Sequence, residues 1–197
     1  MKLPKIVFAV LFSLAHVCLL AQTTFQLELK KSEMIIRGTS SLHDWQCRVE
    51  QIAGTVTAIV DGNQLREVRG AAITAHVNSI RSIREDGTYY EKGMDKNIYR
   101  AMKPEQHPTV TFTVNKVTAG AGVTTVTASG SLKIAGVTKP VSITASVKTN
   151  ADGLIIEGKL PVKMTDYSID PPTALFGTIK TGNEVDVHFK MVFKASK

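Results

Sequence analysis

Apolar and polar residues alternate along most of the chain after residue 21. In the clearest run, Val185, Val187, Phe189, Met191 and Phe193 are separated by mostly polar residues. Because successive side chains of a β-strand point to opposite faces, this period of two predicts a strand with one apolar face and one mostly hydrated face. Further strands are predicted at 25–30, 33–38, 52–60, 73–77, 110–114, 126–134, 141–147 and 153–164.

Short clusters of glycine, asparagine, aspartate and alanine separate these runs. They lie at 61–63, 119–122, 150–153 and 181–183, and such clusters are typical of tight turns. Eight or more strands joined in this way are typical of an antiparallel barrel or sandwich. No repeat, long linker or low-complexity tract indicates a second domain, so we expect a single, mainly β domain.

Residues 88–103, TYYEKGMDKNIYRAMK, break the period of two. The apolar residues of this segment would share one side of a helix: Met94, Ile98, Ala101 and Met102. Thr88 and Glu91 have the spacing of a capping box, Gly93 weakens a continuous helix from there, and Pro104 ends it. The helix can cover the end of the sheet, contribute its apolar side to a ligand cavity, or do both.

The first residues have the pattern of an export signal. Lys2 and Lys5 precede an apolar core at 6–20, and we expect cleavage after Ala21. A membrane-spanning helix, the alternative, needs about 20 apolar residues, whereas this core is shorter and contains His16. The domains are therefore expected to be a cleaved leader at 1–21 and a mature barrel at 22–197.

The net charge of +7 changes this picture little, because two of the positive charges lie in the leader. Export, together with the lack of a basic run interleaved with aromatic residues, argues against a nucleic-acid partner. A transient contact with an anionic membrane is compatible with the charge, as is simple solubility. The sequence leaves the oligomeric state open, and a dimer is compatible with it.

The cysteine content excludes an intramolecular disulfide in the mature domain. Cys18 lies in the leader, so Cys47 is left alone, and a zinc site built from several cysteines is excluded for the same reason. A lone cysteine is typically a small buried apolar residue, with reactive or intermolecular chemistry as the alternative.

The segment 38–47, GTSSLHDWQC, contains the residue types of a hydrolase triad. On a regular strand, however, His43 and Asp44 would point to opposite faces, whereas a triad needs the acid bonded to the imidazole. Cys47 would lie roughly 13 Å along the strand from His43, too far for a direct hydrogen bond. We therefore expect no catalysis at this segment and read it as part of a wall.

The histidines of the mature domain give no metal-binding motif. His43, His76, His107 and His188 lie in different segments, without the spacings that bind zinc. No metal and no cofactor is expected. A metal- or redox-dependent stress protein that uses His43 and Cys47 remains the alternative function.

Small residues recur on the alternating faces, at Ala75, Ala128, Gly130 and Ala145. A closed barrel of about eight strands has an interior wide enough for side chains or one small ligand. Small inward residues would leave such space, and an apolar lining would favour an apolar guest. A barrel filled by its own side chains is the alternative.

Three segments carry a family resemblance: MKPEQHPTVTF at 102–112, GSLKIAGVTKPVSI at 130–143 and MTDYSIDPPTALFGTIKTGNEVDVHF at 164–189. With them the sequence resembles the YceI-like family of bacterial lipid- or polyisoprenoid-binding proteins. The resemblance implies a single antiparallel, eight-stranded, lipocalin-like barrel with one or two short helices. It also implies a long isoprenoid or fatty chain in an apolar cavity, with its polar head near the mouth.

We therefore expect a non-catalytic protein, periplasmic or secreted, that carries or sequesters an isoprenoid or long-chain lipid. The expected wall residues are Leu42, Trp45, Met94, Ile98, Met102, Phe112, Leu132, Ile134 and Phe176. His43 and Tyr99 are the expected polar contacts. On a regular strand, Leu42 and Trp45 could not both face inward.

Overall fold

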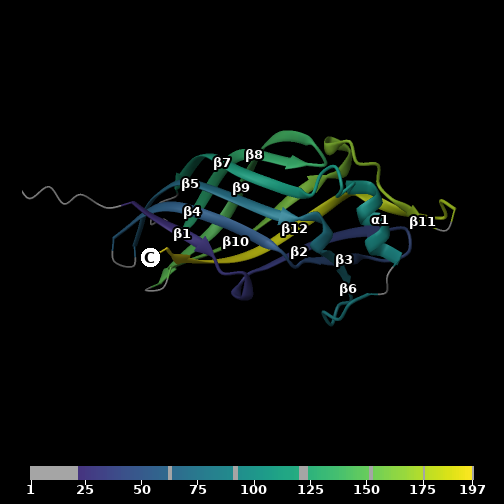
Figure 1. Cartoon of the computed structure of the whole chain (residues 1–197), viewed down its shortest axis with the longest axis horizontal. Helices are drawn as coiled ribbons and strands as arrows, with labels where there is room; N and C mark the ends of the chain where they lie inside the picture. The colour runs from purple at the N-terminus through teal and green to yellow at the C-terminus, as the bar shows by residue number, and fades with distance from the viewer. Residues whose placement is uncertain are drawn as a thin grey trace, which may run out of the picture.

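Eight antiparallel strands close into a barrel in the computed structural model of this chain (Figure 1). In the order of the ring they are β1 (Gln22–Leu27), β4 (Ile52–Asp61), β5 (Gln64–His76), β7 (Thr109–Ala119), β8 (Thr125–Ile134), β9 (Val137–Asn150), β10 (Gly153–Lys163) and β12 (Ile179–Ala195). Pairing of β12 with β1 closes the ring. The predicted fold, a mainly β, eight-stranded antiparallel barrel, is confirmed.

The structure describes residues 22–61, 64–90, 93–119, 124–150, 153–174 and 176–196. The predicted leader at 1–21 lies outside the described residues. Within the described part of the chain, no helix has the length and hydrophobicity needed to cross a bilayer.

Strand β12 changes partner along its length. Its end pairs with β1 through Phe193–Ala195, whereas its earlier part, from residue 181 to residue 190, pairs with β2 (Glu33–Ser40). The sheet then continues from β2 to β3 (Trp45–Val49) and β6 (Ile80–Ile83). The barrel wall is therefore extended at one end by β2, β3 and β6, which diverge from β1 after the short turn η1 (Leu29–Lys31).

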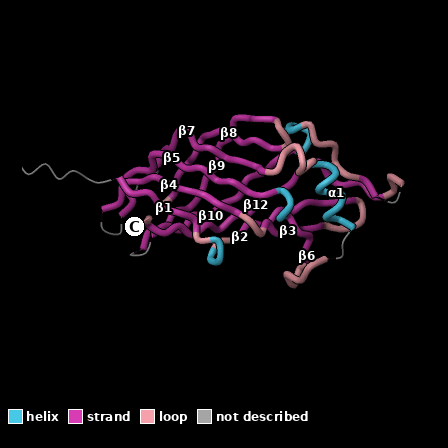
Figure 2. Tube along the Cα trace, in the orientation of Figure 1, coloured by secondary structure: helices cyan, strands magenta, loops and turns pink. Residues whose placement is uncertain are grey.

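Helix α1 (Gly93–Met102) lies at this extended end, opposite the end that holds the C-terminus (Figures 1 and 2). It packs against β6 and the 3-10 turn η2 (Val77–Ser79). The short elements η4 (Met164–Tyr167) and β11 (Thr173–Ala174) precede β12, and β11 pairs with the start of β12.

The helix begins later than the sequence indicated. Thr88 does not cap it, because its backbone N–H and its hydroxyl donate to Asp86 Oδ1, at 2.9 and 2.6 Å. Tyr90 N–H donates to Ser82 O (2.8 Å), so this part of the chain pairs with the sheet. Glu91, the other residue of the expected capping box, lies outside the described residues. The predicted C-terminal end, before Pro104, is confirmed at Met102.

The apolar faces predicted from the alternation point into the barrel. Every second residue of β12 from Val185 to Phe193 lines the interior, and Val56, Leu154 and Phe193 are each only 1% exposed. These three belong to an apolar cluster at the end where β1, β4, β10 and β12 meet. The core is therefore dense at this end of the barrel.

Candidate ligand-binding site

A cavity of about 560 Å³ lies inside the barrel. This volume is within the range of small-molecule pockets, about 300–1,000 Å³. Its lining comes from the barrel strands, from β2 and β3, and from the inner side of α1. Among the described lining residues none is Asp, Glu, Lys or Arg, and most are aliphatic, aromatic or methionine.

Most of the residues predicted from sequence lie in this lining. They are Leu42, His43, Trp45, Met94, Ile98, Met102, Phe112, Leu132 and Ile134. They come from three sources: the segment around β3, the apolar side of α1, and the strands β7 and β8. Strand pairing and the packing of α1 thus bring positions far apart in sequence to one cavity.

Tyr99 and Phe176, which were also expected to contact the ligand, are not among the described residues that line the cavity. The Tyr99 hydroxyl donates to the backbone oxygens of Asn78 (3.1 Å) and Ile80 (3.0 Å), because this side of α1 faces β6 and η2. Phe176 lies in the turn between β11 and β12, with φ +55° and a fully exposed side chain. Tyr99 therefore anchors the helix, and Phe176 projects into solvent.

Residues 41–44 form a turn instead of a strand, which corrects the regular strand assumed for this segment. Ser40 N–H donates to His43 O (3.1 Å), and Ser41 N–H donates to Lys180 O (2.9 Å). Strand β3 begins only at Trp45. Because period-two alternation does not apply across the turn, Leu42 and Trp45 both line the cavity.

The Trp45 side chain packs over the neighbouring strand β2. It pairs with Gly38 of β2, and a Cβ atom added at Gly38 would lie 2.2 Å from Cζ2 of the indole. The indole N–H donates to Thr39 O at 2.9 Å. Glycine is therefore required at position 38, because any side chain would displace the indole from the wall.

Among the described residues, none forms the carboxylate contact with His43 that a catalytic triad needs. Its Nδ1 donates to the backbone oxygen of Asp44 (2.6 Å), and its ring lies 6.4 Å from the ring of Tyr90. In the described parts of the chain no group of three or more His, Cys, Asp and Glu residues is arranged to hold a metal ion. The local geometry places His43 as a neighbour of the cavity opening.

Cys47 lies in the cavity wall and is 1% exposed. Burial raises the pKa of Cys47 to about 12; the negative charge of Asp95 also raises it, and a hydrogen bond with Ser82 acts in the opposite direction. This environment favours the neutral thiol over the thiolate, which is the reactive form.

Asp95 attaches the start of α1 to strand β6. Its Oδ1 accepts hydrogen bonds from the backbone N–H (2.7 Å) and the hydroxyl of Ser82. Its Oδ2 lies 3.5 Å from Nε of Arg81, and the Asp95 side chain is only 14% exposed. With the Tyr99 hydroxyl, this contact positions α1 so that its apolar side faces the cavity.

Replacing Asp95 with alanine is expected to lower the free energy of unfolding by about 1–3 kcal/mol, because the buried Ser82 would lose its acceptor. Urea unfolding of the purified protein measures this change. Glu105→Ala, which removes an exposed carboxylate just after α1, is the matched control and should change stability by less than about 0.5 kcal/mol. Equal effects of the two substitutions would contradict the anchoring role.

Several lining residues were missed by the sequence analysis. Ser40, Tyr90, Asn97 and Thr181 supply polar groups to the lining. Asn97 could have been found, because it lies three positions after Met94 on the same side of the helix. The others depend on turns and strand partners that hydrophobic periodicity does not report.

Comparison with known proteins agrees with this architecture. The family model for the YceI-like domain matches residues 22–193. A search of curated proteins gives no match.

Solved structures share the fold at low identity. The crystal structure of BcnA from Burkholderia cenocepacia has a TM-score of 0.67 at 18% identity and covers 84% of this chain and 98% of its own. A polyisoprenoid binding domain from Saccharophagus degradans, implicated in plant cell wall breakdown, has a TM-score of 0.65 at 15% identity, covering 88% and 99%. The YceI protein of Campylobacter jejuni has a TM-score of 0.52 at 18% identity, covering 72% and 81%.

Proposed function

This chain belongs to the YceI-like family, and from that premise we propose that it is an exported, non-catalytic protein that binds an isoprenoid or fatty-acyl chain inside its barrel. The observation that carries the proposal is the cavity of about 560 Å³ whose described lining holds no charged side chain. The Saccharophagus degradans relative in fold, a polyisoprenoid binding domain, supports an isoprenoid as the first ligand to test.

The apolar lining supplies the free energy for such binding. Each buried CH₂ group contributes about 0.8 kcal/mol, whereas association costs about 4–15 kcal/mol in lost translational and rotational freedom. A chain of about ten buried carbons gains about 8 kcal/mol, which only offsets that cost. The proposed ligand is therefore longer than this, or it adds hydrogen bonds through its head group.

The head group is proposed to be neutral. The polar groups of the lining on His43, Tyr90, Asn97 and Thr181 can exchange hydrogen bonds with a ligand, whereas the Ser40 hydroxyl is already bonded within its own turn. The described lining residues include no cationic Lys or Arg that could pair with an anion. Burying an unpaired charge is far more costly than burying a hydrogen-bonded neutral group. An alcohol, ester, amide or quinone fits these groups, whereas a phosphate or carboxylate would have to remain in water.

Mass spectrometry of an organic-solvent extract of the purified protein tests the proposal directly. A stoichiometric long-chain lipid with a neutral head is the expected result. An extract without lipid, together with no uptake of added isoprenoid alcohols or fatty amides, would refute the proposed function.

Ala128→Phe is expected to weaken ligand uptake about tenfold or more, because the ring would occupy the space into which Ala128 points. Titration with a fluorescent isoprenoid analogue measures the change. Thr127→Phe is the matched control: this neighbour on β8 points to the outer face, where its hydroxyl lies 3.3 Å from that of Thr144. Unchanged uptake by Ala128→Phe would show that the ligand does not occupy the barrel.

A further inference from the structure

The cavity opens at the end of the barrel that carries α1. Leu42, His43 and Tyr90 line the cavity and are also exposed to solvent, so the opening lies among them. The opposite end is closed by the apolar cluster that contains Phe25, which is 4% exposed, and Phe193, which is 1% exposed. A ligand therefore has its access route at the α1 end.

The outer side of α1 carries a stripe of basic residues. Lys96 and Arg100 are exposed and four residues apart, so they share one side of the helix. Lys103, also exposed, follows directly after the helix, where its φ of +49° turns the chain away from the helical path. None of them forms an ion pair with a described residue; Arg100 donates only to the Asn97 amide oxygen, at 3.3 Å. Asp95 is turned inward to Ser82 and Arg81.

Exposed apolar side chains gather at the same end. Leu42 is 66% exposed, Tyr90 is 45% exposed and Phe176 is fully exposed. The turn with Leu42 is bonded to the start of β12, since Ser41 N–H donates to Lys180 O (2.9 Å), and Figure 1 places the neighbouring β11, α1 and β6 together at this end. We call these three residues, with Lys96, Arg100 and Lys103, the mouth surface.

We propose that the mouth surface docks on an anionic lipid bilayer. Aromatic and aliphatic side chains of this size enter the interface between head groups and acyl chains, and basic residues beside them contact lipid phosphates. The purpose of the contact rests on the proposed function: an apolar ligand would pass between the bilayer and the cavity without crossing water.

The charges favour a bilayer over a second copy of the chain. A symmetric dimer formed through the mouth surface would bring two basic stripes together, whereas an anionic membrane attracts them. Among the described acidic residues at this end, Asp44 is in the β2–β3 turn and Glu85 and Asp86 are in the loop after β6. Glu105, two residues after Lys103, is the exposed carboxylate beside the basic residues, which outnumber it. The chain from Gln22 on, without Lys2 and Lys5, has a net charge of 7 − 2 = +5, which adds to the attraction.

Flotation with lipid vesicles tests the proposal on the protein beginning at Gln22, which contains the whole closed barrel. Binding is compared between vesicles of phosphatidylcholine and vesicles of phosphatidylcholine mixed in equal parts with phosphatidylglycerol. We expect binding only to the anionic vesicles and its loss at high salt. Neutralising Lys96, Arg100 and Lys103 to glutamine should weaken binding roughly fivefold for each residue, roughly hundredfold in all.

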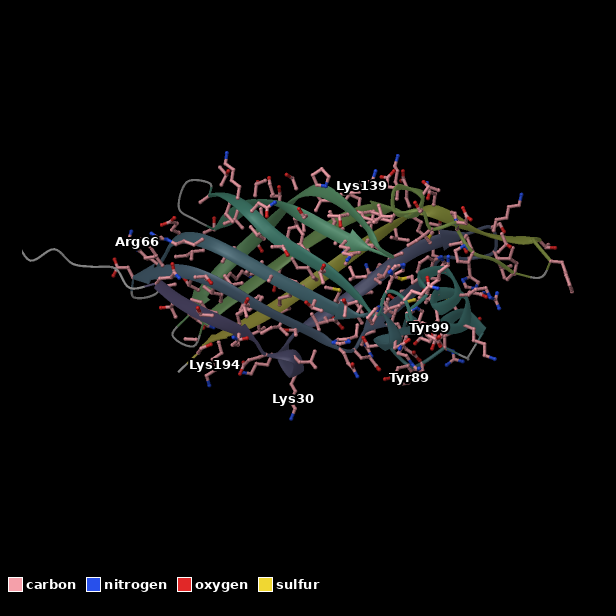
Figure 3. All side chains as sticks on the ribbon, turned by 45° about the horizontal axis from the view of Figure 1, so that its top comes forward. Lys30, Arg66, Tyr89, Tyr99, Lys139 and Lys194 are labelled. Atoms are coloured by element: carbon pink, nitrogen blue, oxygen red, sulfur yellow. The ribbon has the colours of Figure 1, made fainter. Side chains whose placement is uncertain are left out.

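The control variant neutralises Lys30, Arg66 and Lys194, which lie away from Tyr99 of α1 (Figure 3), and so changes the net charge equally. It should bind nearly as the original protein does. A double variant with Leu42→Ser and Phe176→Ser should also lose vesicle binding. Leu29→Ser, which replaces an exposed leucine of η1, should keep it.

Equal losses in the α1 variant and its control, or equal binding to neutral vesicles, would overturn the proposal. The proposal would also be overturned, in favour of a dimer, if the protein did not bind vesicles but self-associated, and if Leu42→Ser and Phe176→Ser abolished that self-association. The flotation assay uses no cavity ligand. Its result therefore does not depend on whether a lipid is found by solvent extraction, and the two proposals can fail separately.

Discussion

Phe193→Ala is expected to lower the free energy of unfolding by about 3–5 kcal/mol, the cost of removing a large buried aromatic side chain. Phe193 is 1% exposed. On β12 it is opposite Leu27 of β1 and Leu154 of β10. Its ring therefore lies in the core next to the few residue pairs that close the barrel, and alanine would leave a void there.

Urea unfolding followed by circular dichroism measures this loss. Phe176→Ala is the matched control, because Phe176 is fully exposed; it should change stability by less than about 0.5 kcal/mol. Similar unfolding midpoints for the two variants would show that the cluster around Phe193 does not hold the barrel closed.

Alkylation of Cys47 is expected to be roughly a thousandfold slower in the folded protein than in urea at pH 8. A thiol with a pKa of about 12 is ionised in about one molecule in ten thousand at that pH, whereas about a quarter of ordinary thiols, with a pKa of about 8.5, are ionised. Rates of iodoacetamide labelling, followed by mass spectrometry, provide the comparison. In the protein beginning at Gln22, which lacks Cys18, Cys47→Ser is the control that should take up no label.

The raised pKa of Cys47 also determines how the free energy of unfolding changes with pH. Below about pH 8.5 the thiol is protonated in both states, so it adds no pH dependence. From there up to about pH 12 the unfolded chain releases the proton that the folded protein retains, so stability falls as pH rises. Cys47→Ser should remove this part of the slope.

Rapid labelling of the folded protein at neutral pH would instead favour the alternative function, a redox protein that uses Cys47 and His43. The structure argues against a reactive thiol because Cys47 faces an apolar cavity and the charge on Asp95 disfavours a thiolate.

Much of the wall could be predicted from local patterns. Period-two alternation assigned Val185, Val187 and Phe189 to the inner face of the last strand, and the structure places all three in the cavity lining. The helical spacing of Met94 and Ile98 likewise identified the side of α1 that faces the cavity. These patterns succeed because side-chain direction within one element follows from its own backbone geometry.

The errors concern positions where a distant segment decides the local structure. The turn at 41–44 depends on Lys180, whose backbone oxygen accepts from Ser41. Pairing of Tyr90 with Ser82 places that part of the chain on the sheet, ahead of the start of α1 at Gly93. Tyr99 faces the backbone of Asn78 and Ile80 because α1 packs on β6.

The sequence by itself determined the fold class, the single barrel domain, the apolar faces of its strands and the inward side of its helix. The mainly β class, the strand faces and the side of the helix follow from the periodicity of apolar residues along one segment of the chain. Periodicity left a barrel and a sandwich open, and the choice of the barrel rested on the resemblance to the YceI-like family. Only the tertiary structure decided where the ring closes, which turn residues reach the cavity and how deeply Cys47 is buried. Those features depend on strand pairing and helix packing between residues far apart in sequence, and a local hydrophobic pattern contains no information about such partners.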